Sequence, residues 1–465
     1  GSADASISWT TNMVLDINSR ISLGNNDSSG ATSNTIFGRL AGNAIASGAI
    51  DNVLIGNEAG NDITTGDYNV AIGANALEKE DVGRGSIAIG AVALGLQNTA
   101  SEGSANNIGI GLNAGVYNVT GTNNTLVGTN VAVGASGQSH SDNTAVGSNS
   151  MLAVTTGIEN TAMGKDSLKS ITTGQKNVVI GSEAGDAMTI ATRSVAIGSR
   201  ALGAEDVGDR SIAIGFACLG SQNTGSDNAT TGNVGIGIET GFYNITGQYN
   251  TLLGTGAGFG VSGNSHSYNT AVGYSSMNSV TTGGSNVGVG FNSLKDSTTG
   301  TQNVGVGTGA SQGLTTGLAN ASMGFQSMLT PTTVQYSVAV GSESMRDIQA
   351  GQALTGVTAI GYSSFKGGGS TTTGANYTTA IGFESLKVLT TGVGNTAVGS
   401  SSGNGITSGS YSTFVGYNTG LVHTTGGYNI AIGYGAMDDT NAGSNSLGSA
   451  ENIFLGVDSG GGTWA

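Results

Sequence analysis

Three histidines are the side chains of this 465-residue chain best suited to hold a metal or move a proton: His140, His266 and His423. The first two lie in matching Ser-His-Ser segments 126 residues apart. Around an axis shared by three copies of the chain, each would form a ring of three imidazoles, a ligand set that Zn²⁺ accepts. Both segments are insertions that should bulge outwards, so we expect solvated loop residues, no bound metal and no cofactor. His140 and His266 are the candidates if a metal is bound.

Acidic residues are the second group of side chains that could bind a metal ion. They recur in GNEAGND at 56–62, in GSEAGDA at 181–187, and in EDVG at 80–83 and 205–208. Carboxylate oxygens are the ligands that Ca²⁺ prefers. The sequence contains neither the nine-residue calcium repeat of toxin β-rolls nor the spacing of an EF-hand loop. We therefore expect these carboxylates to lie on the surface, in water.

Signatures of catalysis are missing. Gly-x-Gly strings such as GVG at 288–290 lack the Gly-Lys-Ser/Thr ending of a phosphate-binding loop. The single cysteine, Cys218, excludes an internal disulfide and a cysteine-based zinc site, and we expect it in the core. We predict that the protein is not an enzyme. One alternative stays open, a glycosidase pair of carboxylates in a cleft between chains.

Composition excludes several partners. Glycine supplies 83 residues and proline one, and 9% of the residues are charged, which excludes collagen and charge-driven disorder. The net charge of −15 should repel the phosphate groups of nucleic acids and anionic membrane surfaces. No apolar run is long enough for a membrane-spanning helix. We expect neither nucleic acid nor membrane as a partner.

A five-residue motif organises the chain. It reads Asn or Ser, then Thr, Val or Ile, then a small residue, an aliphatic residue and Gly, as in NVAIG at 69–73 and NTAVG at 143–147. Its 24 copies end between Gly38 and Gly456, mostly 17 residues apart, and a weaker copy ends at Gly24. A short period that tolerates insertions is typical of a solenoid, in which each coil is one unit.

A longer period lies above the coil. The steps from Gly56 to Gly181 sum to 125 residues, those from Gly181 to Gly307 to 126, and EDVGRGSIAIG is answered by EDVGDRSIAIG. A third block, from 307 to 433, has the same length with differently placed insertions. We predict an end segment at 1–18, a solenoid over 19–460 with blocks at about 56–181, 181–307 and 307–433, and a tail at 461–465.

Period-two alternation in the motif predicts a strand. We expect positions two and four to point into the coil, and the small residue of position three to point outwards against another copy of the chain. A second short strand, such as SM at 150–151, should return a side chain to the core. The motif glycine should make a tight turn, either at positive φ or where another backbone approaches closely. Thr-Thr-Gly, as at 155–157, should close the coil. The asparagines of position one are expected to form a structural ladder.

Recognition, if present, is expected on the longer loops, because loop tips on a rigid scaffold carry most binding sites. Tyrosines near turns could stack on sugars or fill edges. Trp9 and Trp464 are expected to cap the ends. The loops are 95–106, 131–142, 220–232, 257–268, 346–356, 366–377 and 438–451, and the tyrosines are Tyr243, Tyr249, Tyr268, Tyr336, Tyr377, Tyr411 and Tyr428.

The motif with its Thr-Thr-Gly turns resembles the head repeats of trimeric autotransporter adhesins, which form trimeric left-handed β-rolls. Over residues 14–460 it looks closer to repeat-rich tail-fibre proteins of marine and cyanobacterial phages. The longer coil departs from the adhesin heads, and the self-cleaving C-terminal chaperone domain common in phage fibres has no counterpart in this sequence. The resemblance implies a homotrimeric fibre shaft or receptor-binding appendage.

These observations and the resemblance predict an all-β parallel solenoid of about 24 coils with a 17-residue period. The resemblance implies that it is a left-handed β-roll and homotrimeric. Its expected role is a structural, adhesive fibre of a phage virion, located outside the cell, with itself, other virion proteins and a host-surface glycan or protein as partners. Three rivals remain. They are a bacterial autotransporter-type adhesin head, a monomeric ice-binding solenoid and a polysaccharide depolymerase on the same scaffold.

Overall fold

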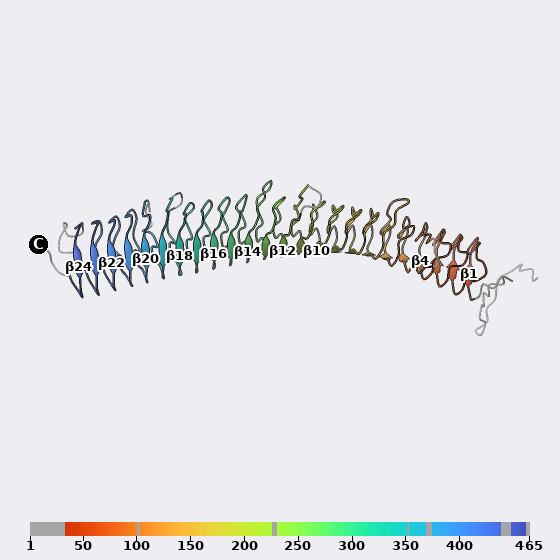
Figure 1. Ribbon diagram of the computed structural model, residues 1–465, viewed down its shortest axis with the longest axis horizontal. Helices are drawn as coiled ribbons and strands as arrows, with labels where there is room; N and C mark the ends of the chain where they lie inside the picture. Colours follow the sequence, from red (N-terminus) through yellow and green to blue (C-terminus); the bar gives the residue numbers. More distant parts are fainter. Residues whose placement is uncertain are drawn as a thin grey trace, which may run out of the picture.

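The computed structural model describes residues 33–99, 103–225, 230–349, 351, 353–368, 374–438 and 448–461. In this part the chain is an all-β parallel solenoid of about 23 turns with a 17-residue period and no helix. Figure 1 shows a gently bent rod in which the strands form one row. Each motif copy supplies one three-residue strand from its positions two to four. The strands are β1 (Thr35–Phe37), β2 (Val53–Ile55), β3 (Val70–Ile72), β4 (Ile87–Ile89), β5 (Ile108–Ile110), β6 (Thr125–Val127), β7 (Thr144–Val146), β8 (Thr161–Met163), β9 (Val178–Ile180), β10 (Val195–Ile197), β11 (Ile212–Ile214), β12 (Val234–Ile236), β13 (Thr251–Leu253), β14 (Thr270–Val272), β15 (Val287–Val289), β16 (Val304–Val306), β17 (Ala321–Met323), β18 (Val338–Val340), β19 (Thr358–Ile360), β20 (Thr379–Ile381), β21 (Thr396–Val398), β22 (Thr413–Val415), β23 (Ile430–Ile432) and β24 (Ile453–Leu455).

Each strand pairs in parallel with the next strand in the chain, and like positions face like. Ala71 of β3 is the register partner of Ala88 of β4, for example. The prediction of a strand at every motif copy is therefore confirmed, while the weaker copy that ends at position 24 lies outside the described residues. At about 4.8 Å per coil, 23 steps give a rod about 110 Å long.

The predicted direction of the strand side chains is wrong. Position three points into the coil, where Ala71 and Ala88 have no exposed surface, while Val70 and Ile72 at positions two and four lie half-buried on the outside. The reason is the narrowness of a 17-residue coil, whose interior accepts a small side chain opposite the leucine or methionine that returns from the other wall. The small residues therefore pack within their own chain and not against another copy.

Exceptions at position three confirm how tightly this interior is filled. Leu54, Leu252 and Phe414 are large and fully buried there. In these coils the position that otherwise returns a large side chain is glycine. A methyl group on Gly258 would lie 2.6 Å from the Leu252 side chain, and one on Gly420 would lie 2.6 Å from the Phe414 ring. Large and small residues are exchanged between the two walls, so the core volume of the coil is kept.

The second wall is built from turns and not from the predicted short strand. Met151 does return to the core and is fully buried, as expected. However, Asn149 and Met151 both have positive φ, of 56° and 52°. The amide of Met151 donates to the carbonyl of Ser167 in the next coil, at 2.9 Å. In this wall, residues with positive φ alternate with residues with negative φ. The backbone amides and carbonyls still bond from coil to coil, but they do not form a regular strand.

The motif glycine is required by both conformation and space. Gly73 has a φ of 138°, and a Cβ added to it would lie 2.6 Å from the carbonyl oxygen of Gly90 in the next coil. Side chains other than hydrogen are excluded from this conformation and from this contact. The sequence prediction for the glycine is therefore confirmed.

Two side-chain ladders tie successive coils together. In the asparagine ladder, Asn52 Nδ2 donates to Asn34 Oδ1 of the preceding coil at 3.0 Å and to the Gly66 carbonyl at 2.9 Å. In the second ladder, the first threonine of Thr-Thr-Gly donates to the next coil, as Thr155 Oγ1 does to the Thr172 carbonyl at 3.1 Å. The asparagine row is thus buried and structural, as predicted.

Candidate assembly surface

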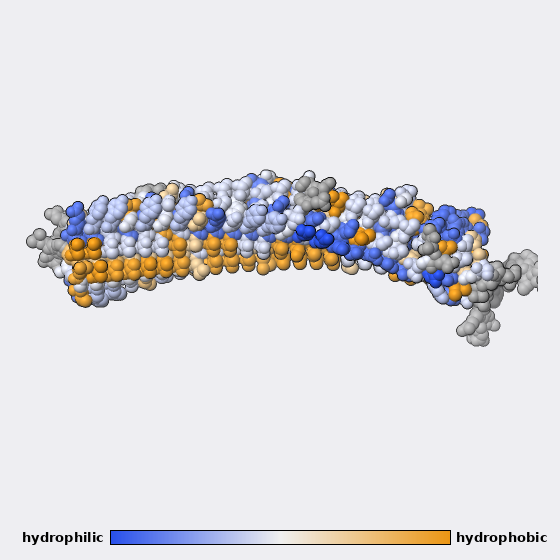
Figure 2. Space-filling view, in the orientation of Figure 1, coloured by the Kyte–Doolittle hydropathy of each residue, from blue (hydrophilic) through white to orange (hydrophobic). Residues whose placement is uncertain are grey.

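The outward rows of positions two and four form a continuous apolar surface along the rod. Every position-four residue is aliphatic, methionine or phenylalanine, and every position-two residue is Thr, Val, Ile or Ala. Met163, Leu253 and Met323 expose 45%, 44% and 53% of their surface. In Figure 2 an apolar band follows one side of the rod over most of its length. We call these two rows the strand face.

Two further columns border the strand face. They consist of the residue directly before the motif, which we call position zero, and the residue directly after its glycine, position six. From residue 216 onwards both columns are rich in aromatic rings that stack from coil to coil. The position-zero pairs are Tyr249–Tyr268 and Tyr411–Tyr428, with ring centroids 5.6 and 5.2 Å apart, and the position-six pairs are Tyr274–Phe291, Tyr362–Phe383 and Tyr417–Tyr434 at 5.6, 5.3 and 5.5 Å.

The position-zero tyrosines from Tyr249 onwards were predicted as candidates, but Tyr68 and the stacking of the rings were not. The position-six column was not predicted either, although its signal, an aromatic residue after the motif glycine, is visible in the sequence. Each ring of these pairs stacks on one neighbour, which covers one of its faces, and Tyr268 still exposes 61% of its surface. Tyr243 differs from the other tyrosines, since it packs edge-on against Phe242 and Phe259.

Position zero carries charges in the other half of the rod. Asp142 and Glu159 are followed in the next coils by Lys176, Arg193 and Arg210. Lys176 pairs with Glu159 at 3.6 Å, with both side chains half in water, so this pair adds little stability. The strand face is therefore bordered by charges in its N-terminal half and by aromatic rings in its C-terminal half.

The strand face is large enough for a stable contact between proteins. Strands three residues wide, at about 3.3 Å per residue, and a rod about 110 Å long give about 1,100 Å². Contiguous apolar patches on soluble monomers are rarely larger than about 300–600 Å². A specific interface needs about 800 Å² from each partner.

The histidines are not the solvated loop residues that we expected. His140 and His266 each expose 2% of their surface. They lie in coils whose insertion has displaced the usual apolar residue, and the imidazole occupies the core in its place. His266 Nε2 lies 3.2 Å from the Gly258 carbonyl oxygen, and burial lowers the pKa of both histidines to about 4.

No described residues form a cluster of three or more His, Cys, Asp or Glu side chains that could hold a metal. His423 is also buried, and its Nε2 lies 2.9 Å from the carbonyl oxygen of Gly426. The structure thus places all three histidines inside single coils as packing groups. Cys218 is buried as predicted, and burial raises the pKa of its thiol to about 12.

Two acidic residues expected in water are instead fully buried. Glu80 accepts hydrogen bonds from the amide of Gly83 at 2.9 Å, from Gln97 Nε2 at 2.7 Å and from Thr99 Oγ1 at 3.0 Å. Its counterpart Glu205 accepts from Gly208 and Gln222 at 2.7 and 2.6 Å. Their oxygens are occupied by donors of the protein, so they are not calcium ligands facing solvent.

The predicted recognition loops are described in part. Residues 100–102, 226–229, 350, 352, 369–373 and 439–447 fall within them and lie outside the described residues, as do Trp9 and Trp464. The loops at 131–142 and 257–268 are described completely, and their histidines turn back into the coil.

Comparison with known proteins places the chain in no family. No protein-family model matches it, and no curated protein matches it. Among the described residues, no helix has the length and apolar character needed to cross a membrane.

Proposed function

We propose that the chain is the shaft of a homotrimeric fibre, and that the strand face is where its copies meet. The observation that carries this proposal is the largely apolar strand face of about 1,100 Å², which runs along the rod and is covered by none of the residues that the structure describes. Burying it would stabilise an assembly by the hydrophobic effect. The residues proposed to meet another copy are those of positions two and four, and not the small residues of position three.

The borders of the strand face favour copies that run in the same direction. In register, the aromatic columns of one copy meet those of the next. In the opposite direction, with the rods fully overlapping, Tyr268 before β14 would meet Arg210 before β11, and Tyr336 before β18 would meet Asp142 before β7. These charges would lose water without matching partners. Parallel copies imply rotational symmetry about the rod axis, as in a trimeric fibre.

The resemblance to phage tail fibres gives this shaft its biological role. We propose a virion component that stands outside the cell, holds its loops away from the particle and attaches to a host-surface glycan or protein. The chemistry is adhesive and mechanical, with no catalytic step.

The mass of the protein in solution tests the proposed trimer. Variants that place lysines on the strand face test where the copies meet. Multi-angle light scattering should give about three times the chain mass of 45.6 kDa. V289K/V306K/M323K puts three charges on the strand face in consecutive coils and should reduce the mass to that of one chain. The matched control T282K/T299K/T316K puts the same charges on exposed threonines of the same coils and should stay trimeric.

A wild-type monomer at micromolar concentration would overturn the fibre proposal and favour the ice-binding rival. An equal loss of assembly in the control would show that added charge, and not its place on the strand face, is responsible.

A further inference from the structure

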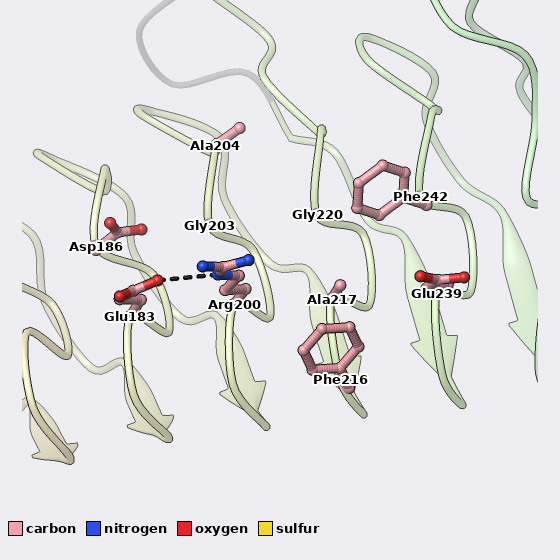
Figure 3. Close-up of a pocket in the computed structure, with 10 residues that line it drawn as sticks. All are labelled: Glu183, Asp186, Arg200, Gly203, Ala204, Phe216, Ala217, Gly220, Glu239 and Phe242. Carbon is pink, nitrogen blue, oxygen red and sulfur yellow. Dashed lines mark hydrogen bonds and ion pairs between the residues drawn. The ribbon is translucent and has the colours of Figure 1, made fainter.

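A groove lies beside the strand face, on the turns that follow β9 to β12. Its volume is about 410 Å³. Figure 3 shows Glu183, Arg200 and Glu239 along one row of turns, with Asp186 and Phe242 along the row above and Phe216 below. The floor is open because the residues between these side chains are glycine or alanine. A second hollow of about 220 Å³ continues the groove along the rod and shares Glu239 with it.

The groove combines flat apolar surfaces with polar groups. Phe242 is held by Phe259, which stacks on it at 5.8 Å, and by Tyr243, which meets it edge-on at 4.8 Å. Phe216 exposes 45% of its surface at the other wall. Rigid, supported aromatic rings offer faces to the C–H groups of a sugar ring.

The charged groups of the groove determine which kind of ligand it favours. Arg200 donates to Glu183 at 2.9 Å, which fixes both side chains. Burial raises the pKa of Asp186, helped by the nearby carboxylate of Glu183. Glu239 forms no ion pair with any residue that the structure describes. Three carboxyl groups and one guanidinium can exchange hydrogen bonds with hydroxyl groups, and they repel anionic ligands.

The first block supplies an internal comparison, because the same coils carry different side chains there. Glu78 and Lys79 stand where the groove has Gly203 and Ala204. In the first block these two form an ion pair at 2.6 Å, and Asn75 also donates to Glu78 at 2.7 Å. The hollow is therefore not imposed by the coil. It lies where the second block has Gly203 and Ala204 in place of these two side chains.

The walls of the groove differ between the blocks as well. Phe216 and Phe242 stand where the first block has Ala91 and Val116. Compared with the first block, the second block therefore has smaller side chains on the floor of the groove and aromatic side chains on its walls, while the coils themselves are repeated.

We propose that this groove binds a neutral oligosaccharide, with its sugar rings against Phe216 and Phe242 and its hydroxyl groups on Glu183, Asp186, Arg200 and Glu239. The inference rests on the proposed function, since it gives host attachment a site on the shaft. One chain supplies every group of the groove. Phe216 is a position-six residue at the rim of the contact proposed between copies, and the other lining residues lie outside the strand face and its two columns.

A panel of immobilised oligosaccharides, uncharged and anionic, tests the proposal. The wild-type full chain should bind at least one uncharged member and no anionic member better. G203E/A204K restores the two residues of the first block and should weaken that binding at least 10-fold. F242V restores the first-block valine and should also weaken it. E78G/K79A, made in the first block, is the matched control and should leave binding unchanged.

Folding of the filled variant is checked separately. Gly203 does not need positive φ, and the first block accepts Glu and Lys in the equivalent coil, so G203E/A204K should keep the wild-type melting temperature within about 2 °C. Binding to no uncharged member, equal binding by G203E/A204K, or preference for anionic members would each overturn the proposal. The mass measurement above decides the assembly independently, so failure of the groove and failure of the fibre can be told apart.

Discussion

The first and second blocks of the solenoid have kept the same interior while their surfaces have diverged. Inside, Glu80, Gln97 and His140 of the first block correspond to Glu205, Gln222 and His266 of the second, and both sets are buried. Outside, an ion-paired surface of the first block corresponds to an open aromatic groove in the second. The difference shows that coil stacking constrains the interior, whereas the turns can change without disturbing it.

Repetition explains why the interior resists change. Many buried polar groups bond to a polar group of another coil, as Glu80 accepts from Gln97 Nε2 at 2.7 Å. Replacing one member leaves its partner buried without a hydrogen bond, which is costly. Residues on the turns have water as an alternative partner.

The largest expected effect is on the motif glycine, and it should be equal in the two blocks. G73V and G198V introduce a β-branched side chain at φ of 138° and 129°, against carbonyl oxygens 2.6 and 2.5 Å from the added Cβ. We expect each to destabilise the rod by about 3 kcal/mol or more, from strain and overpacking together. Chemical denaturation followed by circular dichroism measures this loss. A large effect in one block alone would contradict the equivalence of the interiors.

Acid should destabilise the protein through the buried histidines of both blocks. Their folded pKa of about 4 lies below the ordinary value of about 6.5, so the unfolded chain binds more protons between these limits. Stability is therefore complete above about pH 6.5 and falls as the pH drops towards 4. The expected loss is about 3 kcal/mol for each histidine.

The histidine prediction is checked by melting curves across this pH range. H140N and H266N should each remove a similar share of the dependence, because the two environments match. His423, whose pKa is also lowered by burial, should account for part of what is left. A wild-type melting temperature that is constant from pH 7 to pH 4 would rule out this account.

The smallest expected effect is the difference in stability lost when each of the two buried glutamates, Glu80 and Glu205, is replaced. E80A and E205A each leave amide donors without an acceptor, at a cost of about 2 kcal/mol. Glu80 accepts from Asp81, Gly83, Gln97 and Thr99, and Glu205 from fewer donors, so E80A should cost more. Denaturation midpoints of the two variants decide the order. E159A, at an exposed ion pair, is the control with little expected change.

Much of the fold could be predicted, because the period of 17 and the strand motif depend on local sequence. The strands, the asparagine ladder, the positive φ of the motif glycine and the buried Cys218 all follow from it. The direction of the strand side chains could not be obtained in this way. Alternation shows that Val70 and Ile72 share a side, but not that Ala71 faces the interior. The exchange of Leu252 with Gly258 is a signal that would have decided it.

The sites were harder to predict, because they depend on neighbours in several coils. Insertion length suggested that His140 faces water, whereas the loss of an apolar core residue in the same coil draws it inwards. The groove joins residues from 183 to 242, and no single motif contains it. Comparing the sequences of the two blocks reveals the groove, since Gly203 and Ala204 stand in the second block where the first has Glu78 and Lys79.

The hydrogen bonds between coils run along the length of the rod, and this determines how the protein responds to force. A pull on its two ends acts directly on the bonds between one coil and the next, such as Thr155 to Thr172. Detaching one 17-residue coil replaces about 5 Å of rod with about 55 Å of extended chain. We expect a rod of this kind to lengthen coil by coil from its ends under tension, so that it is stiff at rest and extensible under load.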